Sequence, residues 1–371
     1  MSGGVAAPLR HQNRPLTAIR GLAALWVVGH HYQFEIAALG YRYAGGIFRP
    51  GYLAVDFFFV LSGFVITAVH RDIGVDAASL RNFSLRRVFR IYPLHLFVLA
   101  VLLSFWLYGE AAHGTHDPTE RLRDLPIVAL LLQPYLIQEP SWNVVSWSAG
   151  VELACYLLFP FAMQGLRRLA LPQCLMLLLI TLLFAQHVES GFVWGWPAVL
   201  RGLAGFALGM TLQQASVLLP RPRAPMADLI VLGALAGLVI SVALGHLGSM
   251  PIWSALLVFG LAAEAGRMAR ILGSAPLYGL GLISFSLYLL HPTLANLFFV
   301  WLPPAALPLP HALQVVVWLA LILATLLALS TMSWAFIEEP ARHFGARLAR
   351  RQQHRSGQSV TALPRSPNNG R

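Results

Sequence analysis

The sequence contains no lysine and few charged residues of any kind. Only 11% of its 371 residues are charged, 57% are hydrophobic, and the mean hydropathy is +0.65. Soluble domains carry roughly 25% charged residues, so this composition excludes an ordinary soluble domain. Apolar runs long enough to cross a bilayer recur along nearly the whole chain. We expect one membrane domain at 16–344, after a cytoplasmic segment at 1–15 and before a disordered basic tail at 345–371.

Cysteine is also scarce. Cys155 and Cys174 lie at or within apolar runs and form neither a disulfide framework nor a metal-binding motif. We therefore expect no metal. The net charge of +11 comes from arginine alone. In a membrane protein such an excess reports topology rather than nucleic-acid binding, so we expect no nucleic-acid partner.

The apolar runs predict an all-α membrane protein with about ten transmembrane helices. Segment 125–137 is apolar but too short to span upright. We favour a re-entrant or interfacial piece there over an eleventh span. Gly202, Gly205 and Gly209 indicate close helix packing. The predicted spans are 16–36, 52–69, 93–109, 149–166, 174–188, 194–214, 226–245, 251–266, 278–301 and 312–336.

The predicted connections on one side of the membrane contain many arginines, and those on the other side contain few. A cytoplasmic N-terminus makes every short cytoplasmic connection basic, and it also places the basic C-terminal tail in the cytoplasm. The opposite side then holds only Arg42, Arg49, Arg121 and Arg123. The abundance of arginine, alanine and leucine suggests a bacterial source. We therefore expect a multi-pass protein of the inner (plasma) membrane with both termini cytoplasmic.

Ionisable groups inside a bilayer are costly, and they are functional candidates for that reason. Arg20 and His31 are eleven residues apart in the first predicted span. This spacing is about three turns plus 20°, so both side chains lie on one helix face about 16 Å apart. A cation near the surface in line with a deep imidazole suits a long ligand with an anionic head. The alternative is a snorkelling arginine and a histidine that hydrogen-bonds a neighbouring helix.

Two carboxylates are expected at a depth similar to that of His31, in the outer half of the membrane. Asp56 lies near the start of the second span and Glu152 near the outer end of the fourth. A carboxylate beside an imidazole would fix its tautomer and raise its basicity, as a general base acting on a hydroxyl requires. The alternatives are an interfacial helix-start role for Asp56 and a buried hydrogen-bonding role for Glu152.

The ninth predicted span holds another imidazole. His291 lies next to Pro292 and one turn after Tyr288. Because proline interrupts the helix ladder, His291 and Tyr288 could line a cavity. His291 could equally hydrogen-bond the carbonyl that Pro292 leaves free.

A cluster of three arginines precedes the third predicted span. Arg86, Arg87 and Arg90 could anchor this span to anionic lipid. They could also bind phosphate, for which arginine is a good bidentate ligand. Composition alone favours the anchor.

Six segments of the chain carry recognisable motifs: Arg20 with His31, then 51–64, 86–93, 147–152, 286–292 and 338–340. Together they resemble the motifs of the acyltransferase 3 family of integral membrane acyltransferases, in the same order and over nearly the whole chain. One departure is Ala149–Gly150, where many relatives have leucine and serine.

The resemblance implies ten helices, cytoplasmic termini and an acyl-CoA donor, such as acetyl-CoA, that enters from the cytoplasm. It implies that His31 is the general base, which Glu152 and Asp56 would support. The donor's phosphates would be bound by Arg86, Arg87 and Arg90 with help from Arg20. Some relatives carry an extra extracytoplasmic hydrolase-like domain. The tail here is too short for one, so transfer would finish in the membrane or need a separate extracytoplasmic transfer protein.

The leading hypothesis is O-acylation of a carbohydrate, a sugar on a lipid-linked or exported glycan. One alternative is acylation of a small hydroxylated molecule or a lipid. Another is a proton-coupled transporter, in which the buried ionisable residues relay protons. Transporters usually show repeated halves with broken helices, and the sequence shows none.

Overall fold

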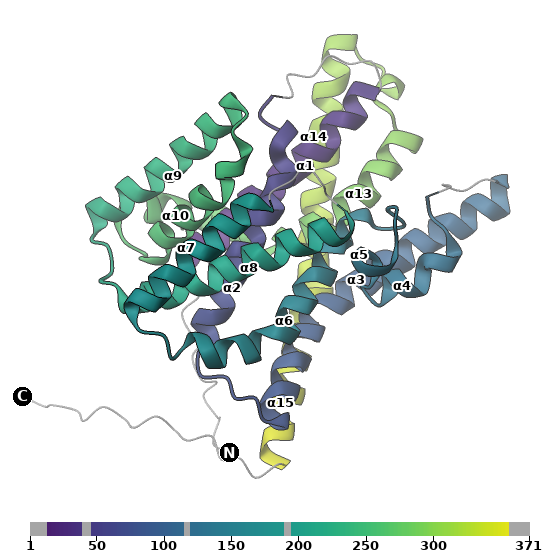
Figure 1. Ribbon diagram of the computed structural model, residues 1–371. Coiled ribbons are helices and arrows are strands. Elements are labelled where there is room, and N and C mark those ends of the chain that lie inside the picture. The colour runs from purple at the N-terminus through teal and green to yellow at the C-terminus, as the bar shows by residue number, and fades with distance from the viewer. Residues whose placement is uncertain (1–12, 39–45, 115–118, 189–193, 356–371) are drawn as a thin grey trace, which may run out of the picture.

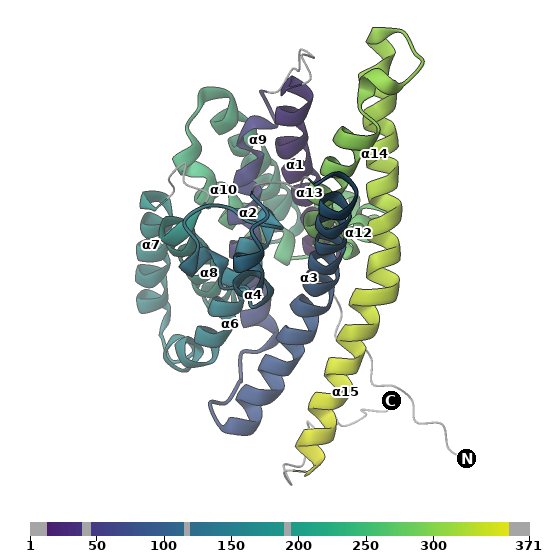
Figure 2. The same cartoon turned by 90° about the vertical axis from the view of Figure 1, so that its right-hand side faces the viewer.

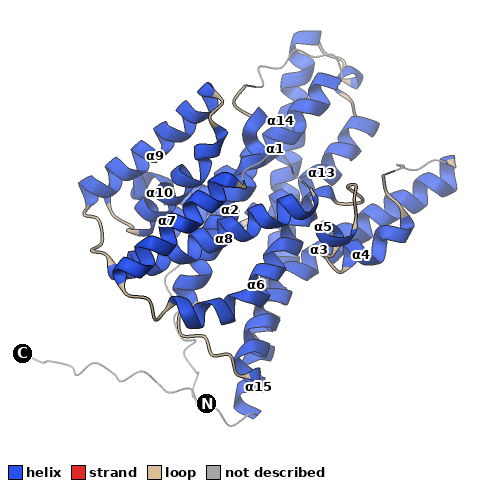
Figure 3. Cartoon of the chain, in the orientation of Figure 1, coloured by secondary structure: helices blue, strands red, loops and turns tan. Residues whose placement is uncertain are grey.

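The computed structural model describes residues 13–38, 46–114, 119–188 and 194–355, and within these ranges the chain forms helices and no strands (Figure 3). The prediction of an all-α protein is confirmed. The longer helices are α1 (Arg14–Ala38), α2 (Ala54–Val69), α3 (Ala77–His113), α6 (Trp147–Leu166), α7 (Leu171–His187), α8 (Gly195–Leu218), α9 (Ala224–Leu244), α10 (Met250–Ala262), α13 (Ser284–Trp301), α14 (His311–Ser333) and α15 (Glu339–Arg355).

Shorter elements join or extend these helices. A π-helical turn, Trp334–Glu338, connects α14 to α15. The short helices are α4 (Leu125–Ala129), α5 (Gln133–Leu136), α11 (Gly266–Leu272) and α12 (Ala275–Leu282). Tight 3-10 turns lie at Arg49–Leu53 (η1), Leu122–Asp124, Val144–Ser146, Leu247–Ser249 and Pro304–Ala306.

Each predicted span contains a helix, but the number of ten spans is not confirmed. Among the described residues, five helices are long and apolar enough to cross a membrane. The number rises to seven if two bent pairs each count as one span: α10 with α11 at 93°, and α12 with α13 at 62°. Helices α1 and α8 are not among the five. Both carry polar residues, including Arg20, His31 and Arg201, which lower their average hydropathy.

Helices α2 and α8 pack closely because glycine removes side chains between them (Figure 1). A Cβ atom at Gly209 would lie 2.0 Å from the Val60 carbonyl oxygen, and one at Gly63 would lie 2.1 Å from that of Phe206. Real side chains cannot approach backbone so closely, so only glycine fits at either position. The prediction of close packing from the glycines of the sixth span is confirmed.

One end of the molecule collects the α2–α3 connection, the α6–α7 connection and α15 (Figure 2). We call it the basic end, because these segments carry Arg71, Arg167, Arg168 and the arginines of α15. The opposite end holds the C-terminal end of α1 and the α13–α14 connection. Helix α15 packs along α3 and continues to Arg355. The expected disordered tail at 345–371 therefore begins with helix, and residues 356–371 lie outside the described part.

Segment 125–137 forms two short helices, α4 and α5, rather than one span. Leu131 between them has a φ of 60°, which turns the chain sharply. Val128, Leu131 and Gln133 are buried, so the segment packs onto the protein. No single helix of this segment is long enough to cross a bilayer.

Candidate active site

Two connected cavities lie among the helices. The wide cavity, of about 700 Å³, is lined by the start of α1, the end of α8 and Arg342 of α15. The inner cavity, of about 160 Å³, lies among α1, α2, α3, α6 and α13. Arg20, Val65 and Arg90 line both, so one continues into the other.

Arginine dominates the polar lining of the wide cavity. Arg20, Arg90, Arg221 and Arg342 come from four different parts of the chain and converge on it. Gln213, which is 8% exposed, also faces this space. Guanidinium groups donate pairs of hydrogen bonds to phosphate, so the wide cavity suits a ligand that carries several phosphates.

Glu152 is fixed in the wall of the inner cavity. Its Oε1 accepts hydrogen bonds from Ser62 Oγ at 2.8 Å and from the Tyr156 hydroxyl. Ser62 precedes the glycine that lets α2 approach α8, and Tyr156 lies one turn after Glu152 on α6. Glu152 also interacts electrostatically with Arg20 across the cavity. The carboxylate is thus oriented by two hydroxyl donors beside a cation.

Two arginines of α3 line the inner cavity and are held by specific partners. Arg87 donates to His70 Nε2 at 2.9 Å and stacks 5.4 Å from the Tyr156 ring centroid. Arg90 pairs with Glu338 at 2.5 Å. The π-helical turn presents Glu338, which also accepts from Ser286 Oγ.

Arg86 departs from this pattern. It lines neither cavity and interacts electrostatically with Arg350 of α15. Successive residues on a helix diverge by about 100°, so Arg86 and its neighbour Arg87 cannot share a direction. The resemblance implies a phosphate-binding role for Arg86, whereas the structure places it on another face of α3.

His31 faces α13. Its Nδ1 lies 3.0 Å from the Val27 carbonyl oxygen and 3.2 Å from Nε2 of His291, which is fully buried. Tyr288 connects this pair to the inner cavity, since its ring centroid is 6.1 Å from that of His291 and its side chain lines the cavity. The Tyr288 hydroxyl lies 2.9 Å from Ser148 Oγ. His291 contacts the Leu287 carbonyl as well as the carbonyl of Tyr288, which is the one that Pro292 leaves without a helical donor.

Asp56 forms a buried ion pair with Arg201 of α8. Asp56 Oδ1 is 2.7 Å from Arg201 Nε, and the side chains are 10% and 2% exposed. The Arg201 guanidinium also lies over the rings of Tyr52 and Trp147, 5.9 Å and 5.8 Å from their centroids. Asp56 therefore ties the start of α2 to α8.

The predicted catalytic residues fall into three groups. His31 meets His291, Glu152 lies across the inner cavity from Arg20, and Asp56 meets Arg201. In the part of the chain that the structure describes, no hydrogen bond or ion pair joins His31 to either carboxylate. Arg20 and His31 lie about 16 Å apart along α1, so Glu152 is nearer the level of Arg20 than expected.

Sequence reasoning missed several polar residues of these cavities. Arg201 is a lone cation within an apolar run. Because a buried charge is costly, the sequence alone could have indicated it as a functional candidate. Arg221 and Arg342 lie in segments predicted to be basic and cytoplasmic, where the sequence indicates only topology. Tyr156 gave no signal, because a tyrosine in an apolar helix is ordinary core.

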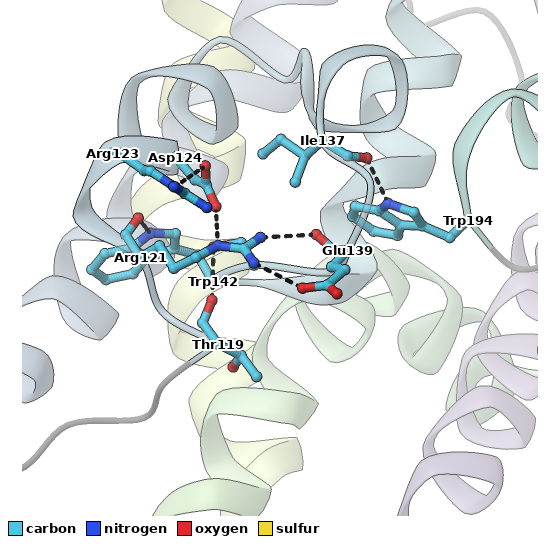
Figure 4. Close-up of polar contacts among 9 residues, drawn as sticks. Thr119, Arg121, Arg123, Asp124, Ile137, Glu139, Trp142 and Trp194 are labelled. Atoms are coloured by element: carbon cyan, nitrogen blue, oxygen red, sulfur yellow. Dashed lines mark hydrogen bonds and ion pairs between the residues drawn. The ribbon is translucent and has the colours of Figure 1, made fainter.

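Residues 119–143, between α3 and α6, are joined by several polar contacts (Figure 4). Arg121 donates to Asp124 at 2.6 Å and to Glu139 at 3.0 Å, and the hydrogen bond to Asp124 raises the pKa of Arg121. Trp142 Nε1 donates to the Arg121 carbonyl at 2.9 Å. Beyond it, Asn143 Nδ2 donates to the Leu289 carbonyl at 3.1 Å, which docks this connection onto α13 beside His291.

Helices long and apolar enough to cross a membrane, with an arginine-lined cavity among them, indicate a multi-pass α-helical membrane protein. Within that class, the model of the acyltransferase 3 family, described as an acyltransferase domain, matches residues 14–336. The chain belongs to this family, which confirms the resemblance found in the sequence.

Two curated relatives match parts of the chain. An acyltransferase named MdmB from Streptomyces mycarofaciens is 32% identical over 160 residues, which cover 42% of this chain and 40% of the relative. Protein 2 in the picA locus of Rhizobium radiobacter is 33% identical over 129 residues, or 34% of this chain and 63% of that protein. The chain thus matches less than two thirds of either relative's length. No solved structure is significantly similar.

Proposed function

We propose that the protein is a membrane-embedded O-acyltransferase that moves an acyl group, most simply acetyl, from cytoplasmic acyl-CoA to a hydroxyl of a lipid-linked or exported carbohydrate. One observation carries the proposal: a wide cavity lined by four arginines continues into a smaller cavity that holds Glu152, and the same helix α1 supplies Arg20 to both and His31 beyond them. Family membership supports the reaction class.

The wide cavity is the proposed donor site. Acyl-CoA carries three phosphate groups at one end and the reactive thioester at the other, joined by a long thin arm. Arg20, Arg90, Arg221 and Arg342 would neutralise the phosphates. The arm would pass between Arg20 and Arg90 into the inner cavity. This arrangement requires the basic end to face the cytoplasm, which the excess of arginine there supports.

His31 is the proposed general base. It takes the proton from the acceptor hydroxyl as the oxygen attacks the thioester carbonyl. The new C–O ester bond forms and the C–S bond breaks. The leaving thiolate then receives the proton from His31, so that the products are the acyl ester and free CoA thiol. His31 ends the cycle in its starting state.

Glu152 is proposed to act on the donor side. Ser62 and Tyr156 hold its carboxylate opposite Arg20. Its charge would keep the Arg20 guanidinium extended along the cavity wall, where the donor passes. Glu152 therefore supports the reaction through Arg20 rather than through the imidazole of His31.

The acceptor is proposed to approach from the opposite end, past the α3–α6 connection. This connection is docked onto α13 by Asn143 and exposes polar groups, including Glu139. Carbohydrates are recognised by such fixed polar side chains. The bilayer surrounds the helices, and the protein is proposed to reside in the bacterial inner membrane.

The acceptor class is tested in the native host. Ester-linked acyl groups on glycans are compared in an intact strain, a deletion strain and a deletion strain complemented with the gene. We expect one acyl ester to disappear on deletion and return on complementation. Unchanged glycan esters, together with thiol release from acyl-CoA by the purified protein, would replace the carbohydrate by a small hydroxylated molecule or a lipid. Absence of thiol release would contradict the acyltransferase itself.

The donor site makes a separate prediction. Arg221→Gln should raise KM for acyl-CoA about tenfold, because one charge-assisted phosphate contact is worth roughly 1.5–3 kcal/mol. Arg86→Gln, on another face of α3, should change KM by less than about twofold on the same reasoning. Steady-state thiol release over a range of acyl-CoA concentrations measures both. Equal effects of the two substitutions would show that the arginines act only through general charge.

A further inference from the structure

The contacts between the two buried imidazoles define where their protons lie. His31 Nδ1 has two neighbours, the Val27 carbonyl oxygen at 3.0 Å and His291 Nε2 at 3.2 Å. The other nitrogen of His291, Nδ1, lies 3.2 Å from the Leu287 carbonyl oxygen. The ring centroids are 4.8 Å apart and the rings are tilted by 57°.

Carbonyl oxygens only accept hydrogen bonds, whereas each nitrogen of a neutral imidazole either donates or accepts. The Val27 carbonyl therefore favours a proton on His31 Nδ1, and the Leu287 carbonyl favours one on His291 Nδ1. His291 Nε2 is then left to accept, and it faces the His31 proton. This assignment satisfies all three contacts. Moving the protons to the Nε2 atoms would turn lone pairs toward two carbonyl oxygens.

We propose that His291 is a positioning residue that holds His31 in the tautomer with its proton on Nδ1, so that His31 Nε2 is free to act as the base. This inference rests on the acyl transfer proposed above. His291 does not itself exchange a proton with substrate. It acts on His31 in the way that an orienting partner fixes which nitrogen of a catalytic imidazole is basic.

The surroundings of His291 make it a rigid support. It is fully buried, and the Tyr32 hydroxyl donates to its carbonyl oxygen at 3.2 Å. One turn earlier on α13, the Tyr288 hydroxyl donates to the Val145 carbonyl at 3.0 Å. Helix α13 at this point is thus tied to α1 and to the 3-10 turn that precedes α6. When His31 becomes an imidazolium, its Nδ1 proton still points at two acceptors, which stabilise the charge.

Kinetics of four purified variants of the full-length protein test the role. His291→Leu should lower kcat about 100-fold with KM for acyl-CoA within about threefold, because loss of an orienting partner affects the proton transfer and not donor binding. His291→Gln offers an acceptor oxygen and should recover about a tenth of wild-type kcat or more. His95→Leu is the matched control, since His95 on α3 is equally buried and its Nε2 lies 2.9 Å from a backbone carbonyl oxygen, that of Val128 on α4. His95→Gln completes the pair.

A kcat for His291→Leu within about threefold of the His95→Leu value would overturn the positioning role. Failure of glutamine to exceed leucine at position 291 would do the same. These outcomes separate a defined hydrogen bond from loss of a buried imidazole in general.

Tautomers can also be read without any activity. Nitrogen-15 spectra of histidine-labelled full-length protein in lipid nanodiscs distinguish a protonated from an unprotonated ring nitrogen, and His31→Gln identifies the His31 signals. We expect a protonated Nδ1 and an unprotonated Nε2, replaced by a mixture in His291→Leu. A proton on Nε2 of His31 in the wild type would overturn the inference. Because no substrate is involved, this result is independent of whether the proposed function fails.

Discussion

Replacing His31 with glutamine is expected to lower kcat for acyl transfer by about a thousandfold, in the middle of the range for removing a general base. Glutamine keeps the length of the side chain and can still donate to the Val27 carbonyl, so the local packing of α1 is retained. What it lacks is a nitrogen that can take a proton from a hydroxyl. Thiol release from acyl-CoA, measured with purified protein and normalised to the amount of folded protein, gives kcat.

His30→Gln provides the matched control for this measurement. His30 is the adjacent imidazole, but its Nδ1 lies 2.8 Å from the Arg49 carbonyl and holds η1 instead of facing α13. We expect His30→Gln to keep kcat within about threefold of wild type, because it removes no proton acceptor from the reaction. Equal losses in the two variants would show that α1 needs its histidines for structure, and would reject His31 as the base.

Local patterns in the sequence were sufficient to predict the helices, but they could not show which side chains meet. The apolar periodicity of α1 depends on neighbouring residues, so the extent of this helix was accessible from the sequence. The partner of His31 is His291, 260 residues away, and no spacing rule relates the two positions. The glycines of α8 were informative because close packing requires small residues wherever the partner helix lies.

Charge counting shows a similar limit. Arg86, Arg87 and Arg90 form a single cluster in the sequence, yet in the structure they take up three different environments. Arg87 stacks on aromatic rings, Arg90 pairs with Glu338, and Arg86 faces α15. A count of arginines along the chain does not give the direction in which each side chain points. On a helix that direction changes by about 100° from one residue to the next.

The ion pair between Asp56 and Arg201 should be the most costly polar contact to break. Asp56→Asn leaves the Arg201 guanidinium, 2% exposed, without its counter-charge. Removing one partner of a buried ion pair costs about 3–5 kcal/mol, and Arg201→Met should cost a similar amount. The midpoint of thermal unfolding in detergent, followed by solubility or tryptophan fluorescence, is expected to fall strongly for both single variants.

The double substitution Asp56→Leu with Arg201→Met tests whether the Asp56 carboxylate has a structural or a catalytic role. It removes both charges and keeps apolar volume, so it should be more stable than either single variant. Since no hydrogen bond or ion pair joins Asp56 to His31 among the described residues, kcat per folded molecule should remain within about tenfold of wild type. This limit is well below the loss expected for a general base. A stable but inactive double variant would instead place Asp56 in the chemistry, as the sequence resemblance implies, and would mean that α2 moves toward His31 during the reaction.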